Sequence, residues 1–467
     1  MLNGEAQRPE ADGLDCAWKP FEIHFSYGRQ RSGRPRQRRR STEGNMLDWY
    51  DCDHSVQEFG VHLATNIAAF GIVVCSGLGF AAGQGSSTFR FVFAEKPGQY
   101  GVGLRVVEQY DHARTFQLEG GSSEKSAGPG SPRPLQTLVW YPAPSSSNRT
   151  MTFGDYETLI KTETSFGKPV EDGKPQKFVE SYMEGTTVLP AWAVRDAEMQ
   201  PGRFPVVIYA PSLNAPATEN IELCEYLASQ GFVVIASPSM GATSRSMTVD
   251  ISGANAEAQD ITFLLGFAVT LPDTDMSEVA AMGYSWGGMA ALLAAARDKR
   301  VDALISLNSS FVTAGDIHPD QMTIPLLVFS RGEDTLKYSD SQRKDKTQCD
   351  GAPNVLNEWT HGDLLHAQLL AVSHIQFSSL YQRSERFRKE AMQFSPADYS
   401  LEEGAVSYNW MARYTLEFLN AYLKHDDTAA LFLKRTPAEN GVPKHLIALS
   451  LRQASPQTGQ ANTPVKK

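Results

Sequence analysis

The segment 283–288, with the sequence Gly-Tyr-Ser-Trp-Gly-Gly, contains the residues best suited to chemistry. A short apolar run at 279–282 predicts a strand before it, and an Ala- and Leu-rich run at 289–296 predicts a helix after it. The order strand, G-x-S-x-G, helix is typical of a nucleophile elbow, a tight turn that presents a serine hydroxyl at the end of a sheet. The flanking glycines lack Cβ atoms, so strand and helix can approach closely around the serine. Ser285 is therefore the candidate nucleophile.

A nucleophilic serine needs a general base, and in enzymes with this elbow the base histidine comes last in the chain. His374 follows a strand predicted at 367–373, at the edge where the carboxyl ends of parallel strands meet. We therefore expect His374 to be the base. His366 precedes that predicted strand and is expected at the opposite edge of the sheet.

The acid that orients the base should lie between the serine and the histidine in the chain. Asp334 follows a strand predicted at 324–330 and is the candidate acid. Glu333 and Asp316 are competing carboxylates for this role.

An oxyanion hole requires two backbone N–H groups aimed at the developing negative charge. Trp286, directly after the serine, is expected to supply one of them. The other is expected from the loop after a strand that ends at Ala210, and Leu213 is favoured there because Pro211 has no N–H.

The chain from residue 204 onward alternates between predicted strands and predicted helices. The strands are predicted at 205–210, 232–236, 279–282, 301–307, 324–330 and 367–373, and the helices at 219–230, 255–271, 289–296 and 409–424. This alternation indicates an α/β fold with a mostly parallel sheet and helices on both faces. We expect one catalytic domain at 91–455, with β segments at 99–116 and 135–141, an insertion near 143–175, and a polar tail at 456–467.

The first 90 residues differ in composition from the rest. Residues 29–40 hold seven arginines, which indicates a disordered basic tail, a patch for nucleic acid or anionic lipid, or sequence upstream of a true start at Met46. Residues 59–89 contain no Asp, Glu, Lys or Arg, and their apolar centre ends in small residues. This leader is similar to a signal peptide and favours a secreted or periplasmic protein. A membrane anchor through 63–83 and a buried helix are the alternatives.

Composition narrows the classes of function. The chain has 467 residues and is 41% hydrophobic, which is enough for a large core in one or two domains. Its net charge of −10 argues against nucleic acid as a partner of the body. The five cysteines are scattered and odd in number, so they indicate neither a disulfide framework nor a metal site. We expect no metal and no cofactor.

With these residues placed, the chain resembles the dienelactone-hydrolase-like branch of the α/β-hydrolases, and more closely the bacterial relatives of platelet-activating-factor acetylhydrolase. The likeness covers about residues 97–452. It rests on 101–103 with 111–114, on 138–143, on Leu213 with 225–232, on the elbow at Ser285, and on the sequence His-Ile-Gln-Phe-Ser at 374–378. The resemblance implies Ser285 as nucleophile, His374 as base, and Leu213 and Trp286 as the oxyanion hole.

One position departs from the acetylhydrolase-like pattern. In those enzymes the acid follows the strand that here ends at Leu307, and Asn308 occupies that place. In dienelactone hydrolase the acid follows the later strand, which matches Asp334. An Asp-to-Asn change in a serine protease triad lowers the rate by about four orders of magnitude. Either the acid is Asp334, or the enzyme is impaired.

The sequence thus predicts a serine carboxylic ester hydrolase that acts through an acyl-enzyme on short-chain or phospholipid-like esters. A peptidase or acyltransferase on the same triad is the first alternative. A catalytically weak binding protein of the same fold is the second, and Asn308 is the feature that favours it. The expected partner is a small-molecule ester. No nucleic acid partner is expected, and membrane contact is expected only through the leader.

Overall fold

The computed structural model describes residues 90–117, 130–146, 148–166, 185–309, 317–331, 355–386, 396 and 398–455. Its contacts divide the chain into two units, residues 1–87 and 88–467, and the described residues all belong to the second. The basic tail, the apolar leader and the C-terminal tail predicted from the sequence lie outside the described residues. In the part that is described, no helix has the length and apolar character needed to cross a membrane.

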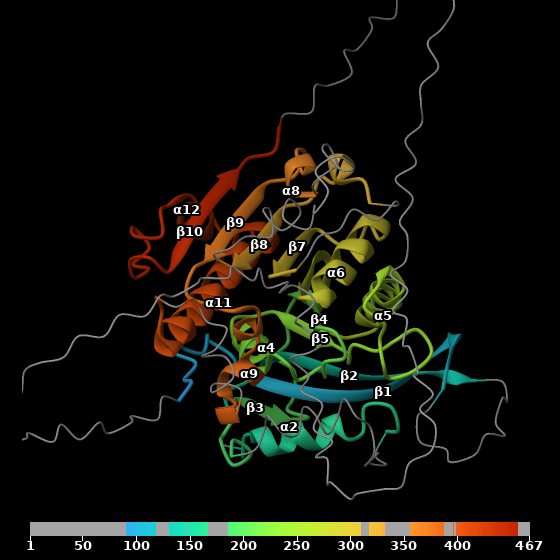
Figure 1. Ribbon diagram of the computed structural model, residues 1–467. Helices are drawn as coiled ribbons and strands as arrows, with labels where there is room; N and C mark the ends of the chain where they lie inside the picture. The colour runs from blue at the N-terminus through green and yellow to red at the C-terminus, as the bar shows by residue number, and fades with distance from the viewer. Residues whose placement is uncertain are drawn as a thin grey trace, which may run out of the picture. The chain divides into compact units, whose positions relative to one another are not determined.

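The described strands form one sheet of ten, in the order β10-β9-β8-β7-β6-β4-β5-β2-β1-β3 (Figure 1). Their bounds are β1 Gly101–Phe116, β2 Ser131–Ala143, β3 Ala193–Arg195, β4 Phe204–Ala210, β5 Val233–Ala236, β6 Thr274–Tyr284, β7 Ala303–Leu307, β8 Leu326–Arg331, β9 Leu364–Leu369 and β10 Ile447–Arg452. The adjacent strands β5, β4, β6, β7, β8 and β9, in this order across the sheet, run parallel. In contrast, β2 is antiparallel to both β1 and β5, and β10 is antiparallel to β9. The predicted mostly parallel sheet is therefore confirmed.

Helices cover both faces of this sheet. Their bounds are α2 Phe153–Ile160, α4 Ile221–Ser229, α5 Ile251–Ala268, α6 Trp286–Arg297, α8 Val355–Glu358, α9 Ser379–Arg383, α11 Leu401–Leu423 and α12 Asp427–Lys434, with short 3-10 turns η1 Pro319–Gln321 and η2 His374–Phe377. One apolar core packs α2, α4 and α11 on one face, and a second packs α5, α6 and α8 on the other. Every residue of β4 and β5 is buried between them, which explains their unbroken apolar sequences.

Several predicted boundaries need correction. The last parallel strand was predicted at 367–373, but β9 starts at Leu364, where its ladder with Leu326 of β8 begins, and ends at Leu369 opposite Arg331. His366 therefore lies inside β9 rather than before it. The helix predicted from residue 409 starts at Leu401, because Ser400 and Glu403 form a capping box there. The insertion near 143–175 had no clear period, yet it contains the capped helix α2.

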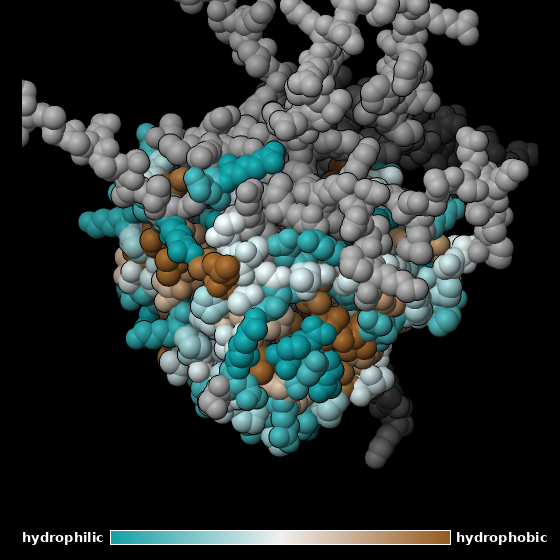
Figure 2. Space-filling model, turned by 90° about the horizontal axis from the view of Figure 1, so that it is seen from below, coloured by the Kyte–Doolittle hydropathy of each residue, from teal (hydrophilic) through white to brown (hydrophobic). Residues whose placement is uncertain are grey.

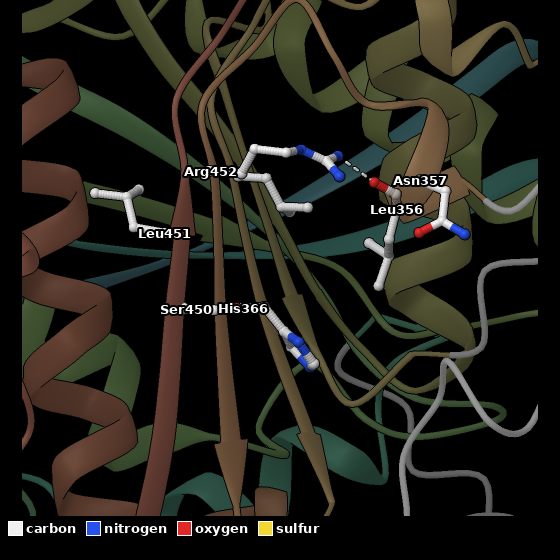
Figure 3. A pocket seen from close by; sticks show the side chains of 7 residues that line it. Leu356, Asn357, His366, Ser450, Leu451 and Arg452 are labelled. Carbon is white, nitrogen blue, oxygen red and sulfur yellow. Dashed lines mark hydrogen bonds between the residues drawn. The ribbon is translucent and has the colours of Figure 1, made fainter.

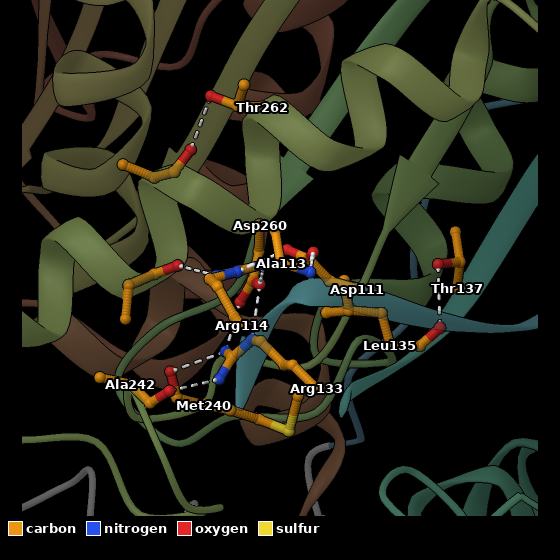
Figure 4. Close-up of polar contacts among 12 residues, drawn as sticks. Asp111, Ala113, Arg114, Arg133, Leu135, Thr137, Met240, Ala242, Asp260 and Thr262 are labelled. Atoms are coloured by element: carbon orange, nitrogen blue, oxygen red, sulfur yellow. Dashed lines mark hydrogen bonds and ion pairs between the residues drawn. The ribbon is translucent and has the colours of Figure 1, made fainter. Parts of the chain in front are cut away.

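The antiparallel β1–β2 pair is fixed to α5 by buried charge (Figure 4). The fully buried Arg133 in β2 contacts Asp260 in α5 through two nitrogens, at 2.8 and 2.6 Å, and Arg114 in β1 contacts the same carboxylate at 2.6 Å. Arg133 also donates to the carbonyls of Met240 and Gly241 in the loop after β5. Buried charges require such pairing, so this network determines where the β5–α5 loop lies.

The surface of the described unit mixes polar and apolar groups. Figure 2 shows apolar side chains in small groups among polar ones on the face seen from below. Across the described residues, the exposed large hydrophobic side chains are Val92, Tyr110, Val188, Val249, Ile251, Val269, Val406 and Leu431. They are spread over several elements, from β1 to α12, and scattered exposed apolar side chains are ordinary on a folded protein.

Candidate active site

Ser285 lies between the end of β6 and the start of α6, with φ 53° and ψ −119°. A non-glycine residue stays in this region only where the surrounding structure fixes it, and here the Ser285 N–H donates to the Leu307 carbonyl at 3.0 Å. A Cβ at Gly283 would collide with the Gly287 carbonyl, and one at Gly287 would collide with the carbonyls of Ala210 and Pro211. The glycines of the segment therefore allow α6 to begin directly against β4 and β6, and the serine occupies the tight turn between them.

His374 lies beside this serine, although 89 residues separate them in the chain. Its Nε2 is 2.8 Å from the Ser285 Oγ. The histidine begins η2, and the capping box of Ser373 and Gln376 defines that turn. The Tyr284 hydroxyl donates to the His374 carbonyl at 2.8 Å, so the elbow also fixes the backbone of the histidine. The arrangement can move a proton from the serine hydroxyl to the ring.

Asn308 lies at the other ring nitrogen, with its Nδ2 2.5 Å from the His374 Nδ1. It follows β7 in the left-handed region, at φ 52°, which asparagine tolerates better than most residues. Its backbone N–H donates to Phe329 at 2.8 Å, and its side chain is buried. The sequence-predicted acid Asp334 and its competitors Glu333 and Asp316 lie outside the described residues.

The amide of Asn308 decides which ring nitrogen carries the proton. A histidine that accepts the serine proton on Nε2 must carry its own proton on Nδ1, and that proton needs an acceptor. The Asn308 Oδ1 is buried and has no hydrogen-bond partner in the described part of the chain. A half-turn of the amide exchanges its oxygen and nitrogen, which presents Oδ1 to Nδ1–H. Asn308 can therefore support the tautomer of a general base.

Burial controls the charge of His374. Desolvation lowers the pKa of His374 to about 3, with a smaller contribution from the positive charge of Arg331. The ring is therefore neutral at neutral pH and can accept a proton. A neutral amide beside Nδ1 offers no negative charge that would oppose this shift.

The two expected oxyanion donors lie on adjoining segments. Trp286 is the first residue of α6, and Leu213 is in the loop after β4. Among the described residues, neither backbone N–H donates a hydrogen bond to another group. The close contact of Gly287 with the carbonyls of Ala210 and Pro211 brings the start of α6 against this loop. Both N–H groups thus lie at the same edge of the sheet.

Sequence reasoning missed the groups that fix this loop. Asn214 has φ 59°, and its Oδ1 accepts from the Met247 N–H at 2.6 Å. Arg245 donates to the Asn214 carbonyl at 3.2 Å and forms a buried ion pair with Glu163 at 2.8 Å. On the other side, the carboxylate of Glu219 accepts from Ser212. These residues come from separate elements, and no local motif could have indicated them.

His366 contacts a second serine, Ser330. Its Nε2 is 2.8 Å from the Ser330 Oγ, and both residues lie within their strands. A cavity of about 160 Å³ lies beside it among α8, β9 and β10 (Figure 3). The cavity is lined by Leu356, Asn357, Leu364, His366, Ser450, Leu451 and Arg452, and neither Ser285 nor His374 belongs to its lining. Among the described residues, no cluster of three or more His, Cys, Asp or Glu could hold a metal ion.

Comparison with known proteins finds a matching family and similar solved structures. Residues 191–355 match the family model of the Dienelactone hydrolase family. A ferulic acid esterase from Streptomyces cinnamoneus, solved at 2.4 Å resolution, has a similar structure with a TM-score of 0.52 and 18% identity, covering 72% of this chain and 93% of that one. That likeness shows the α/β-hydrolase fold and confirms the predicted fold class. No curated protein matches the chain.

Proposed function

We propose that the chain is a serine carboxylic ester hydrolase, and the match of residues 191–355 to the Dienelactone hydrolase family supports this. The observation that carries the proposal is the 2.8 Å contact between Ser285 Oγ and His374 Nε2 at a strained elbow. A serine in hydrogen-bond contact with a neutral buried histidine is the arrangement that makes a hydroxyl nucleophilic. The predicted dienelactone-hydrolase-like branch is confirmed, and the closer likeness to acetylhydrolases stays a prediction.

The proposed reaction passes through an acyl-enzyme. His374 takes the Ser285 proton on Nε2 as the oxygen attacks the ester carbonyl. The N–H groups of Leu213 and Trp286 stabilise the oxyanion that forms. Protonated His374 then gives its proton to the leaving alcohol, and the ester C–O bond breaks. Water attacks the acyl-serine by the same steps and releases the carboxylic acid.

We propose Asn308 as the residue that orients the base, because its amide lies 2.5 Å from Nδ1. An amide can fix the ring and accept the Nδ1 proton, but it does not stabilise the imidazolium as a carboxylate would. The enzyme would then be slower than one with an aspartate at this position. Asp334 remains the alternative from the sequence.

Labelling with a serine-reactive fluorophosphonate tests the proposal. The wild-type protein should be labelled and should hydrolyse a short nitrophenyl ester, whereas Ser285→Ala should lose both properties and keep its melting temperature. Ser330→Ala is the matched control, because the Ser330 hydroxyl also lies 2.8 Å from a histidine nitrogen, that of His366, but belongs to strand β8 and not to an elbow. Hydrolysis above background by folded Ser285→Ala would exclude Ser285 as the nucleophile.

The substrate class needs a second measurement. We propose short-chain or phospholipid-like esters, and a series of nitrophenyl esters of increasing acyl length together with a phospholipid would rank them. Peptide and amine acceptors in the same assay distinguish a peptidase or an acyltransferase. A protein that binds such esters but is neither labelled nor active would instead be a binding protein of this fold, as the neutral Asn308 would favour.

The location of the protein is a proposal from its leader alone. The apolar, charge-free stretch at 59–89 favours export, so that the mature protein would be secreted or periplasmic. The N-terminus of the mature protein, determined from the producing cell, tests this: a start close to residue 83 supports export. An uncleaved leader in a membrane fraction would indicate an anchor instead.

A further inference from the structure

We propose that Glu219 is a positioning residue that fixes the oxyanion loop, the loop after β4 that contains Leu213, relative to the base histidine. This inference rests on the proposed function. Glu219 has no exposed surface and lies in the turn between β4 and α4. It forms no part of the reacting group of atoms. Its effect would pass through Ser212, the residue before the expected donor Leu213.

The carboxylate of Glu219 receives three hydrogen bonds. One oxygen accepts from the Ser212 N–H at 2.8 Å and from the Tyr209 hydroxyl at 3.1 Å. The other oxygen accepts from the Ser212 hydroxyl at 2.5 Å. Ser212 is thus bound through both its backbone and its side chain, so its orientation is fixed. Since the peptide unit that follows carries the Leu213 N–H, the carboxylate determines where that donor points.

The same turn also binds the segment that follows the histidine. The Glu219 carbonyl accepts from the Ser378 hydroxyl at 3.0 Å and from the Leu380 N–H at 3.1 Å. The neighbouring Asn220 accepts from the Ser379 N–H at 2.8 Å through its Oδ1. The oxyanion loop and the histidine segment are therefore fixed to one turn from its two sides.

Burial favours the neutral form of the Glu219 carboxyl group. Desolvation raises the pKa of Glu219 to about 7, although its hydrogen bonds from Ser212 oppose this shift. The neutral form is therefore substantially populated near neutral pH. A glutamine is a close mimic of it, because its Oε1 can accept from the Ser212 N–H while its amide donates to the Ser212 hydroxyl.

Glu225, which lies in α4 shortly after the Glu219 turn, provides a matched control. It is equally buried, accepts from Tyr156 at 2.7 Å and from the N–H groups of Trp192 and Ala193 at 2.8 and 3.0 Å, and burial raises its pKa to about 7 as well. Its partners lie in and before β3 and in α2, away from Ser285. Loss of either carboxylate should destabilise the fold, but only loss of Glu219 should alter the oxyanion loop.

The experiment compares Glu219→Ala, Glu219→Gln and Glu225→Ala. Folded sites are counted by fluorophosphonate titration, and kcat per titrated site, KM and inhibition by a trifluoromethyl ketone are then measured. Glu219→Ala should lose about a hundredfold in kcat per site and in inhibitor affinity, near the effect of one oxyanion donor, with KM little changed. Glu219→Gln should stay within about fivefold of the wild type, because its Oε1 can still accept from the Ser212 N–H and the Tyr209 hydroxyl while its amide donates to the Ser212 hydroxyl. Glu225→Ala should lose sites and melting temperature but keep its kcat per site.

The inference is overturned if Glu219→Ala has fewer titratable sites but the same kcat per site as Glu225→Ala. If Glu219→Ala does not fold, Ser212→Ala is decisive, since it removes only the 2.5 Å bond and should lower kcat per site about tenfold. An unchanged kcat in Ser212→Ala would overturn the inference as well. A wild-type protein that is neither labelled nor active would instead overturn the proposed function, and the inference with it.

Discussion

At the scale of single residues, the neutral state of His374 predicts an unusual pH profile. A histidine base must be unprotonated, and burial lowers the pKa of His374 to about 3. The neutral form is therefore present above that pH and is lost only as the pH falls through it. We expect kcat/KM to stay nearly constant down to about pH 5, whereas an unperturbed histidine would lose half its activity near pH 6.5. A half-loss near that higher value in a kcat/KM profile would contradict this environment.

The partner of Nδ1 can be tested by substitution at Asn308. Asn308→Asp places a carboxylate at 2.5 Å from the ring, which should stabilise the imidazolium and raise kcat by at least about tenfold. The same charge raises the pKa of the ring, so the acidic limb of the pH profile should move to higher pH. Asn308→Ala should lower kcat by about a hundredfold, as for loss of a catalytic group.

Asp334→Asn is the comparison for these variants, because Asp334 is the acid predicted from the sequence. With Asn308 as the orienting residue, Asp334→Asn should keep a kcat within a few fold of the wild type. Should Asp334→Asn be inactive and Asn308→Ala fully active, the acid is Asp334 and the contact seen at Nδ1 is not the productive one.

The sequence indicated the reacting pair because both residues have local signals. Ser285 lies in a five-residue pattern, and His374 was found from chain order and a predicted strand. Asn308 was recognised as a rival only through family resemblance. Glu219 and Arg245 could not be found this way, since a buried carboxylate or guanidinium acquires its role only when folding brings its partners to it.

At the scale of elements, two glycines in neighbouring helices predict opposite outcomes. Gly287→Ala puts a Cβ against the carbonyls of Ala210 and Pro211, so the elbow must open, and we expect a lower melting temperature and loss of esterase activity. Gly266 lies inside α5 with nothing within 4 Å of its Cβ position. Gly266→Ala should therefore stabilise the protein by about 0.5–1 kcal/mol through helix propensity. Denaturant unfolding measures both, and equal effects would contradict the packing at the elbow.

The elements were easier to predict than their ends. Buried central strands such as β4 have continuous apolar sequences, which single them out. β9 was misplaced by three residues at its start because its polar His366 and Gln368 hide a strand whose register is determined by β8 and β10. The edge strand β10 was not predicted, since its alternating pattern is short and half exposed.

At the scale of the whole molecule, the division at residue 87 predicts that the N-terminal unit is dispensable. Residues 88–467 form a separate set of contacts, and the candidate site lies wholly within them. A chain that begins at Thr88 should therefore have the kcat and melting temperature of the full-length protein. Insoluble or inactive protein from the shorter chain, under conditions where the full chain is active, would show that residues 1–87 belong to the fold.

The turn at Glu219 and Asn220 also has a consequence for the order of folding. Ser378 and Ser379 bond to residues that precede them by 159 positions. During synthesis, the oxyanion loop and the elbow therefore exist well before the histidine segment can join them. Contacts over such separations form late, because the entropy of closing a long loop is lost before the contact compensates for it. Hydrolytic competence should thus be the last property that a refolding chain acquires, later than the burial of its tryptophans.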